Sequence, residues 1–227
     1  MSANQVIKDH DKWRKGVGGA QAGLSGESDG DSYSGLDLDF ITISSTRFNG
    51  GSFTSTTFKD ASWSSSQFTG VRFTGCSMED LAITGCTFTN CTFSNCNMQS
   101  LKMTGCDLQS CNYENCMMKD SQMSDCTGGG GGSMSDCDMS GAGMSGCTFT
   151  GATLTGAVYS GTQWAGCKFQ GCTWKNLGFI NCQWTGLDIL DCHCDGIQGE
   201  GVKGEKVVYY GSFFENSEFR NSNINTA

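Results

Sequence analysis

The ten residues CTFTNCTFSN, Cys86–Asn95, contain the same five-residue unit twice. In each unit a small residue is followed two positions later by phenylalanine, and asparagine stands two positions after that. Read outward in steps of five, the phenylalanine position holds a large apolar residue from Leu38 to Ile224 with few interruptions. Twelve of the 14 phenylalanines lie in this one position, which chance placement would not produce. A period of five residues therefore organises the chain.

Each unit has three recurring slots. The large slot takes Phe, Met, Leu, Ile, Tyr or Trp, and the small slot, two residues earlier, takes Ala, Val, Leu or Cys. The turn slot, two residues after the large one, takes Gly, Asn, Asp or Ser, which tolerate turn conformations. Fourteen of the 15 cysteines lie in the small slot: Cys76, Cys86, Cys91, Cys96, Cys106, Cys111, Cys116, Cys126, Cys137, Cys147, Cys167, Cys172, Cys182 and Cys192.

This pattern predicts a solenoid. Side chains alternate along an extended segment, so the small and large slots share one face. A five-residue unit cannot bury these two residues alone, but coiling the chain and stacking the coils buries a continuous core. A helix would need a period of 3.6 residues, which is absent. A globular β-sandwich would show irregular turn spacing, so both alternatives are excluded.

The run Cys86–Asn95 resembles the pentapeptide-repeat family, whose consensus is a small residue, a variable residue, Leu or Phe, and two variable residues. The resemblance covers roughly residues 36–226. Cysteine replaces the usual alanine, and Phe or Met the usual leucine, which keeps the interior apolar. The resemblance implies an all-β fold, a right-handed quadrilateral β-helix with four pentads per coil and roughly nine to ten coils. At a strand spacing of about 4.8 Å, such a rod is about 45 Å long.

Two regions depart from the repeat. We expect residues 1–35 to form an N-terminal arm, either flexible or docked on a partner, and residues 36–226 to form the solenoid. A glycine-rich stretch at 126–133 shifts the pattern by one residue, because Met123 and Met134 are 11 residues apart. The run Gly128–Gly132 is either an extra corner residue or a loop that replaces a whole pentad. The sequence leaves both possibilities open.

The arm supplies the first candidate partner-binding residues, Trp13, Arg14 and Lys15. Tryptophan and arginine are common anchors of protein interfaces. A disordered leader and a cap on the first coil are the alternatives.

The C-terminal end supplies the second candidate set. Val208, Tyr210 and Phe213 occupy slots that should face outward, and Leu190 should lie beneath Tyr210. An exposed apolar patch of this kind usually marks an interface. The alternative is that Gly199 and Gly204 disrupt these coils, so that the four side chains pack inward.

The cysteines invite a metal or redox interpretation, but their spacing favours packing. Structural zinc sites use pairs such as Cys-x2-Cys, whereas neighbouring cysteines here lie five or a multiple of five residues apart until the glycine run. Stacked thiols such as Cys76 and Cys96 could bind a soft metal or oxidise, yet free cysteine is also a small buried hydrophobe. His193 should point away from Cys192 and Cys194. We expect no catalytic residue, no cofactor and no metal site.

The composition limits location and partners. The net charge is -9 and the isoelectric point about 4.5, so no basic footprint for direct nucleic-acid binding is present. No apolar stretch approaches the roughly 18 residues of a membrane span, and the first residues lack the apolar core of a secretory signal. An odd number of cysteines, 15, favours reduced thiols. We therefore expect a cytoplasmic or otherwise intracellular protein.

Two functions fit these features. The first is a non-enzymatic scaffold or adaptor that mediates protein–protein interactions with unknown partners. Its C-terminal coil would also permit a homo-oligomer or end-to-end stacking, because an uncovered edge offers unpaired backbone groups.

The second function is implied by the resemblance: a DNA mimic that binds or protects a type II topoisomerase, DNA gyrase. Residues 46–227 carry 16 acidic and 10 basic side chains, a net of -6. DNA carries about one charge per 1.7 Å, or roughly 26 over about 45 Å. This mismatch favours the adaptor.

Overall fold

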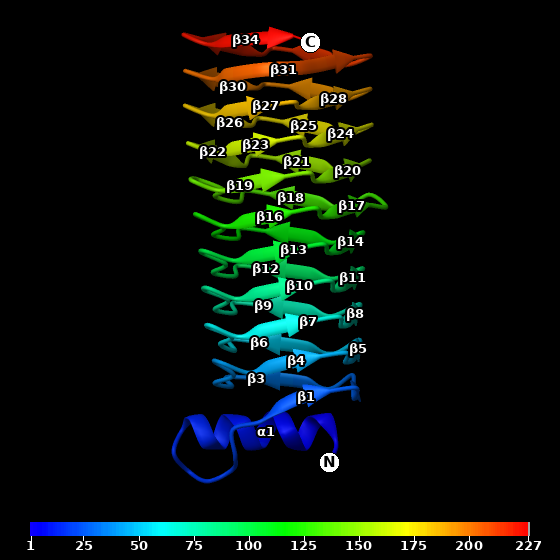
Figure 1. Ribbon diagram of the computed structural model, residues 1–227, viewed down its shortest axis with the longest axis vertical. Coiled ribbons are helices and arrows are strands. Elements are labelled where there is room, and N and C mark those ends of the chain that lie inside the picture. Colours follow the sequence, from blue (N-terminus) through cyan, green and yellow to red (C-terminus); the bar gives the residue numbers. More distant parts are fainter. Residues whose placement is uncertain (227) are drawn as a thin grey trace.

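The computed structural model describes residues 1–226 as one helix followed by a long stack of short strands (Figure 1). The chain winds upward from the helix and forms a β-solenoid of about ten turns. Strands of successive coils pair in parallel, and in the middle of the stack each residue pairs with the one four pentads further along, as Ala82 with Lys102. Four pentads therefore make one coil, as the sequence predicts. The fold class is confirmed, with the addition of a helix.

The elements are α1 (Ala3–Arg14) and strands on four faces of the coil. The first face contains β1 (Gly23–Ser25), β4 (Thr42–Ser44), β7 (Ser62–Ser64), β10 (Ala82–Thr84), β13 (Lys102–Thr104), β16 (Gln122–Ser124), β19 (Gly143–Ser145), β23 (Gln163–Ala165), β27 (Gln183–Thr185), β31 (Lys203–Tyr210) and β34 (Asn223–Thr226). The second contains β2 (Ser28–Asp29), β5 (Arg47–Asn49), β8 (Gln67–Thr69), β11 (Thr87–Thr89), β14 (Asp107–Gln109), β17 (Thr127–Gly129), β20 (Thr148–Thr150), β24 (Lys168–Gln170) and β28 (Asp188–Leu190). Strand β31 is long enough to turn the corner and pair with both faces.

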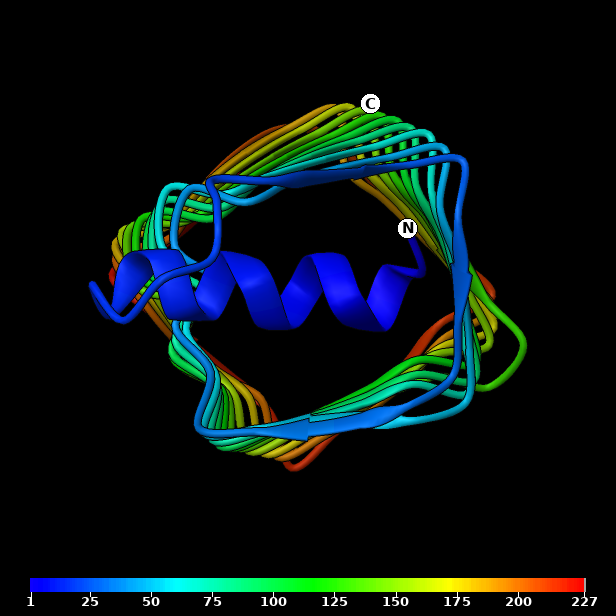
Figure 2. The same ribbon diagram turned by 90° about the horizontal axis from the view of Figure 1, so that it is seen from below.

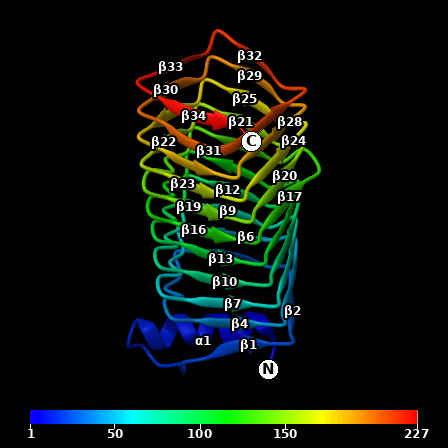
Figure 3. The ribbon, with the colours of Figure 1, turned by 45° about the horizontal axis from the view of Figure 1, so that its top comes forward.

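The third face contains β3 (Ser32–Ser34), β6 (Ser52–Thr54), β9 (Arg72–Thr74), β12 (Thr92–Ser94), β15 (Asn112–Glu114), β18 (Ser133–Ser135), β21 (Thr153–Thr155), β25 (Thr173–Lys175), β29 (His193–Asp195) and β32 (Phe213–Glu215). The fourth contains β22 (Val158–Ser160), β26 (Gly178–Ile180), β30 (Gln198–Glu200) and β33 (Glu218–Arg220). Below β22 this face is held by single bridges that run from Asp37 to Val158. The coils thus stack one above another along the rod (Figure 3).

Large-slot side chains fill the interior as stacked rings. On the third face, Tyr33, Phe53, Phe73, Phe93 and Tyr113 form one column. The rings of Phe73 and Phe93, and those of Phe93 and Tyr113, lie 4.8 Å apart and nearly parallel. Each such pair adds about 0.5–1.5 kcal/mol to the free energy gained by burying its surface. The inter-coil spacing therefore sets the aromatic geometry.

Cysteine thiols pack the small slots, except for Cys194, which lies in a large slot opposite Trp174. All 15 are buried and free. The Sγ of Cys91 donates to the carbonyl of Phe68 at 3.3 Å, and the same contact recurs between Cys167 and Met144 at 3.4 Å. Burial raises the pKa of Cys86 to about 11 and that of Cys194 to about 12. These two thiols stay protonated at neutral pH, and a protonated thiol is a poor nucleophile and metal ligand.

The turn slot bends the backbone as predicted. Asn90 and Asn95 both have φ of 54°, and Gly105 has φ of 59°. This left-handed conformation is open to glycine and is tolerated best by asparagine and aspartate among other residues. The residue preference of the slot therefore follows from its backbone angle.

The first coil begins earlier than the expected boundary at residue 36. Residues 23–34 form β1, β2 and β3, which pair with the second coil. The repeat is hidden there for two reasons. First, the large slot that pairs with Phe48 holds the polar residue Asp29. Second, the step along the chain from Asp29 to Phe48 is one residue shorter than the step of four full pentads from Tyr33 to Phe53. A polar residue and a shortened unit together conceal this coil from a search in steps of five.

The glycine run contains one extra corner residue and does not replace a whole pentad by a loop. Gly129 pairs with Gln109, four full pentads earlier, whereas the separation between Ser133 and its partner Asn112 is longer by a single position. The added residue lies between β17 and β18, at Gly130–Gly132, where φ is 68° at Gly130 and 80° at Gly131. Gly128 itself occupies an ordinary large slot opposite Leu108.

Gly199 and Gly204 keep their large slots, although the pairing of β31 with β34 shifts register between Gly204 and Val207. Gly199 pairs with Phe179 below and Phe219 above, and Gly204 pairs with Trp184 and Ile224. A Cβ at Gly199 would lie 2.3 Å from the ring of Phe219. The larger neighbour thus occupies the space that glycine leaves.

The aromatic column gives a stability prediction. Replacing Phe93 by alanine removes a ring held between Phe73 and Tyr113, and we expect a loss of about 3–5 kcal/mol in the free energy of unfolding. Thr92→Ala, on the same strand but not in the interior, should cost less than about 1 kcal/mol. Urea unfolding followed by circular dichroism measures both. Equal losses for the two variants would contradict the column's role.

Candidate functional site at the two ends of the solenoid

Helix α1 lies across the opening of the first coil (Figure 2). Its apolar residues Ala3, Val6 and Ile7 are buried against the core. The helix starts at Ser2, whose hydroxyl accepts a hydrogen bond from the backbone N–H of Gln5 at 3.3 Å. An N-cap of this type satisfies one of the free amides at the start of a helix. Helix α1 therefore caps the lower end of the core.

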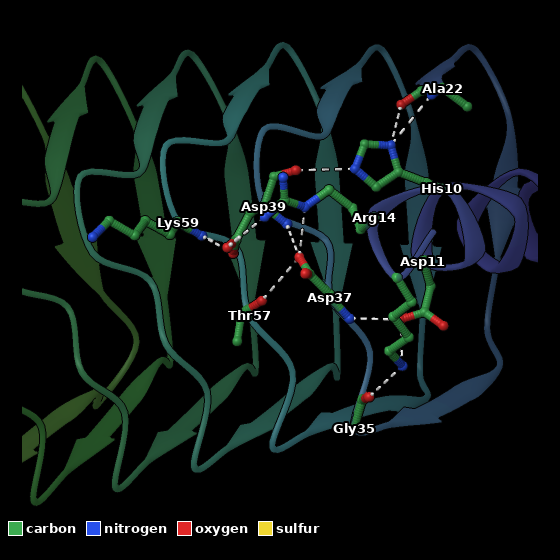
Figure 4. Close-up of polar contacts among 10 residues, drawn as sticks. His10, Asp11, Arg14, Ala22, Gly35, Asp37, Asp39, Thr57 and Lys59 are labelled. Carbon is green, nitrogen blue, oxygen red and sulfur yellow. Dashed lines mark hydrogen bonds and ion pairs between the residues drawn. The ribbon is translucent and has the colours of Figure 1, made fainter. Parts of the chain in front are cut away.

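A buried histidine joins the helix to the first coil (Figure 4). His10 is fully buried, and its Nδ1 and Nε2 each lie 3.0 Å from a carbonyl oxygen, those of Ala22 and Asp39. The backbone N–H of Ala22 also donates to Nδ1 at 3.2 Å. Both ring nitrogens of His10 therefore have hydrogen-bond partners on the backbone of the first coil. His10 thus acts as a structural connector.

Arg14 and Lys15 attach the end of the helix to the next turn of chain (Figure 4). Arg14 Nε donates to Asp37 at 2.9 Å, and its Nη2 lies 3.4 Å from Asp39. The guanidinium also lies 5.1 Å from the centre of the Phe40 ring, a cation–π contact. Lys15 Nζ contacts Asp11 at 2.7 Å and the Gly35 carbonyl at 3.1 Å.

The cap is therefore the alternative that the structure supports for this segment. Two of the three candidate residues, Arg14 and Lys15, are engaged within the chain, whereas Trp13 remains 38% exposed and packs edge-on against His10 at 5.4 Å. The segment is an ordered helix from Ala3 to Arg14, not a flexible arm over that length. Partner binding by these three residues stays a prediction.

The cap gives a second prediction. Arg14→Gln should speed hydrogen exchange of the β1 and β3 amides about fivefold, because it removes the link between α1 and Asp37. Lys12→Gln is the matched control, since Lys12 pairs only with Asp9 on the helix surface. Exchange in β11, far from the cap, should not change. Identical exchange in the two variants would contradict a fastening role for Arg14.

The opposite end of the rod carries exposed aromatic side chains. Tyr210 is 74% exposed and Phe213 68% exposed. Leu190 lies directly beneath Tyr210, as expected, and is half-buried. Val208 pairs with Asp188 and is also half-buried. Leu190, Val208 and Tyr210 thus lie together on the second face, and Phe213 lies past the corner on the third face, where it pairs with His193. None of the four faces the core.

Beside this outer patch the core itself opens. A cavity of about 510 Å³ lies at the top of the stack. It is lined by Trp184, Tyr209, Ser212, Phe214, Ser217, Phe219, Ser222 and Ile224. Tyr209 and Phe214 occupy large slots, yet 37% and 38% of their surfaces are exposed. We name the patch and this cavity together the C-terminal surface.

Serines occupy the small slots that line the cavity. Ser212, Ser217 and Ser222 accept hydrogen bonds from the backbone N–H groups of Cys192, Ile197 and Val202, at 3.0, 3.1 and 3.0 Å respectively. A hydroxyl tolerates both a backbone donor and water, whereas a thiol prefers an apolar setting. Polar small slots therefore accompany the half-exposed large slots of this coil.

Sequence reasoning identified the outer patch but missed the cavity. Tyr209 and Phe214 fit the large slot, which predicts a place in the core. The run of serines at 212, 217 and 222 was the available signal: single hydroxyl residues such as Ser66 and Thr162 fill other small slots, but three in succession occur only at this end. The indole Nε1 of Trp184, buried and without a hydrogen-bond partner among residues 1–226, belongs to the same region.

Within residues 1–226 no group of three or more His, Cys, Asp or Glu side chains is arranged to hold a metal ion. His193 is exposed while Cys192 and Cys194 are buried, so the three side chains do not converge. No helix in the described part of the chain has the length and apolar character needed to cross a bilayer.

The stacked coils of five-residue units define the class: a pentapeptide β-solenoid. A family model for the pentapeptide repeat region matches residues 66–128, and one for pentapeptide repeats in eight copies matches residues 131–156. The chain is a pentapeptide-repeat protein. No curated protein sequence matches it.

Solved structures resemble the chain in fold. HetL, a pentapeptide repeat protein involved in heterocyst differentiation regulation in the cyanobacterium Nostoc sp., aligns with a TM-score of 0.50 and 12% identity, over 99% of this chain and 97% of HetL. QnrB1, a plasmid-mediated fluoroquinolone resistance protein, aligns with a TM-score of 0.31 and 15% identity, over 83% of this chain and 94% of QnrB1. The catalytic domain of a GH87 alpha-1,3-glucanase reaches 0.40 and 9% identity, over 88% and 55%. At these identities the likeness concerns the fold alone.

Proposed function

We propose that this protein is a non-enzymatic adaptor that holds a protein partner at its C-terminal surface. The observation that carries the proposal is the exposure of Tyr210 and Phe213 next to an open aromatic cavity. Exposed aromatic side chains beside a desolvated pocket are the usual anchors of protein interfaces. The rest of the rod presents mainly Ser, Thr, Asn and Gln, a neutral surface that suits a spacer. The partner's identity is open, and a second copy of the chain is one candidate.

The two ends of the rod differ in how much apolar surface they expose, and this difference supports the C-terminal surface as the binding site. At the lower end, α1 buries Val6 and Ile7 over the core and uses Arg14 for attachment. At the upper end, Phe214 and Tyr209 remain half-exposed. Covering apolar surface is worth about 25 cal/mol per Å², so an apolar partner surface gains free energy at the upper end and not at the lower.

Site-specific photo-cross-linking tests the proposal. A photo-reactive phenylalanine analogue at position 213 should cross-link one discrete partner, either a second copy or another protein of the native source. The same analogue at Thr84, an exposed position on β10, is the matched control and should give no such product. Absence of a product from position 213, or the same product from both positions, would rule the C-terminal surface out.

Sedimentation analysis separates the two occupants. If a second copy binds there, the double substitution Tyr210→Ser and Phe213→Ser should convert a dimer into a monomer at about 50 µM, a loss of affinity of about tenfold or more. Both side chains are exposed, so folding should be nearly unaffected. A monomer at this concentration for the unaltered chain would exclude self-association and leave another protein as the partner.

DNA mimicry is the second candidate, and the net charge of -9 is the observation that favours it. Two outward carboxylates are neutralised within the rod, Glu79 by Lys59 at 3.5 Å and Asp138 by Lys119 at 3.2 Å. The net charge already counts both partners of each pair, and its density along the rod is sparse beside that of DNA. We expect gyrase supercoiling to be unchanged at about 10 µM of the protein, well above the Kd of a specific complex. Inhibition of supercoiling, or protection of gyrase from a fluoroquinolone, would favour the DNA mimic over the adaptor.

A further inference from the structure

Two neighbouring inward slots of the sixth coil, residues 122–142, hold glycine. Gly128 occupies the large slot between Leu108 below and Phe149 above. Gly132 follows the corner and lies against the backbone of Cys111, where a Cβ would come within 2.7 Å of the Cys111 carbonyl oxygen. Between Cys126 and Met134 the coil therefore contributes no side chain to the interior.

The ring of Phe149 occupies the space above Gly128, where a Cβ would lie 2.7 Å from it, and a cavity of about 50 Å³ that reaches the surface remains beside the glycine run. We name it the glycine window. It is lined by Leu108, Cys111, Tyr113, Gly128, Gly129, Gly132, Ser133, Met134, Phe149, Ala152 and Leu154. Met134 and Phe149 are only partly buried, and Tyr113 and Ala152 are 7% and 8% exposed, whereas Phe73 and Phe179 in intact coils are at 0%.

A second cavity of about 40 Å³ lies behind the window. The two share Leu108, Tyr113, Met134, Phe149 and Leu154 as walls. Four further methionines border the inner one: Met118, Met123, Met139 and Met144. Methionine side chains are flexible and polarisable, so they adapt to a guest more readily than the aromatic rings of the coils above and below.

One residue that lines the window, Tyr113, has a polar group without a hydrogen-bond partner in the described part of the chain. The Tyr113 hydroxyl is buried, and no group of residues 1–226 forms a hydrogen bond with it. Its ring is held in place by the stack on Phe93 at 4.8 Å. Burial raises the pKa of Tyr113 well above its ordinary value, so the hydroxyl keeps its proton and can donate. An unsatisfied buried hydroxyl is costly, and a guest with one hydrogen-bonding atom would satisfy it.

We propose that the glycine window is a binding site for a small aliphatic molecule with a single hydroxyl or carbonyl group. The apolar walls contact the aliphatic part of the molecule, and the Tyr113 hydroxyl donates a hydrogen bond to its hydroxyl or carbonyl oxygen. A water molecule needs about 10–15 Å³ of such space, so the outer cavity takes a guest of about four or five non-hydrogen atoms. The site is separate from the C-terminal surface, because the cavities share no lining residue.

Isobutanol and xenon are the probes, and methionine methyl groups are the reporters. In a protein with ¹³C-labelled methionine methyls, isobutanol should shift the Met134 and Met144 signals saturably, with a Kd of about 1 mM. The methyl of Met78, three coils lower, should not move. Xenon, which is apolar, should shift the same two signals because an apolar cavity accepts it. Absence of saturable shifts with both probes would overturn the proposal.

Two variants separate the polar and apolar parts of the site. Tyr113→Phe should weaken isobutanol binding about fivefold and leave xenon binding unchanged, while the melting temperature stays the same or rises. Ala152→Val narrows the cavity from above and should weaken both probes. If water alone fills the window, Tyr113→Phe lowers the melting temperature and neither probe binds, which contradicts the proposal. Equal isobutanol affinity in Tyr113→Phe and the unaltered protein would contradict the assigned role of the hydroxyl. If Ala152→Val does not fold, the first variant and the Met78 control still decide the outcome.

Discussion

The parallel backbone ladder between coils is the constraint on which the rest of the structure depends. Each strand donates and accepts along the stack, as between Lys102 and the Leu81 carbonyl at 2.9 Å, so that identical slots lie one above another. This repeat determines which groups are in contact between coils. Aromatic rings stack on aromatic rings, cysteine thiols donate to strand carbonyls, and left-handed corners lie above left-handed corners. A residue that suits one coil therefore suits its neighbours, which explains why so few residue types fill the interior.

Much of this was predictable from the sequence because the period and the slots are local. The large slot of Phe93, the small slot of Cys91 and the corner at Asn95 can each be read without knowing any distant contact. The first coil was not predictable in the same way, since Asp29 and a missing residue break the period just where α1 replaces the lower neighbour. The polar network of His10, Arg14 and Asp37 also depends on residues brought together only by folding.

The candidate site was predicted in part. Tyr210 and Phe213 follow from the outward slots, and Leu190 beneath Tyr210 follows from the repeat of four pentads per coil. The exposure of Tyr209 and Phe214 could not be read from their own slots, because it depends on what covers the coil above them. The glycine window shows the same limit, since the register alone did not decide whether Gly128–Gly132 was a corner or a loop. The space it leaves depends on how Phe149 and Tyr113 pack.

The change of interior along the rod has a mechanical consequence. Aromatic rings fill the coils around Phe73 and those around Trp174, while the coils between them are rich in methionine and contain the two glycine window cavities. In a solenoid each coil contacts only the coils beside it, so tension applied along the axis is carried by every inter-coil layer in turn. The layer with the smallest area of packed surface resists the tension least. The rod should then part first near Gly128, as two stiff blocks joined by a compliant segment.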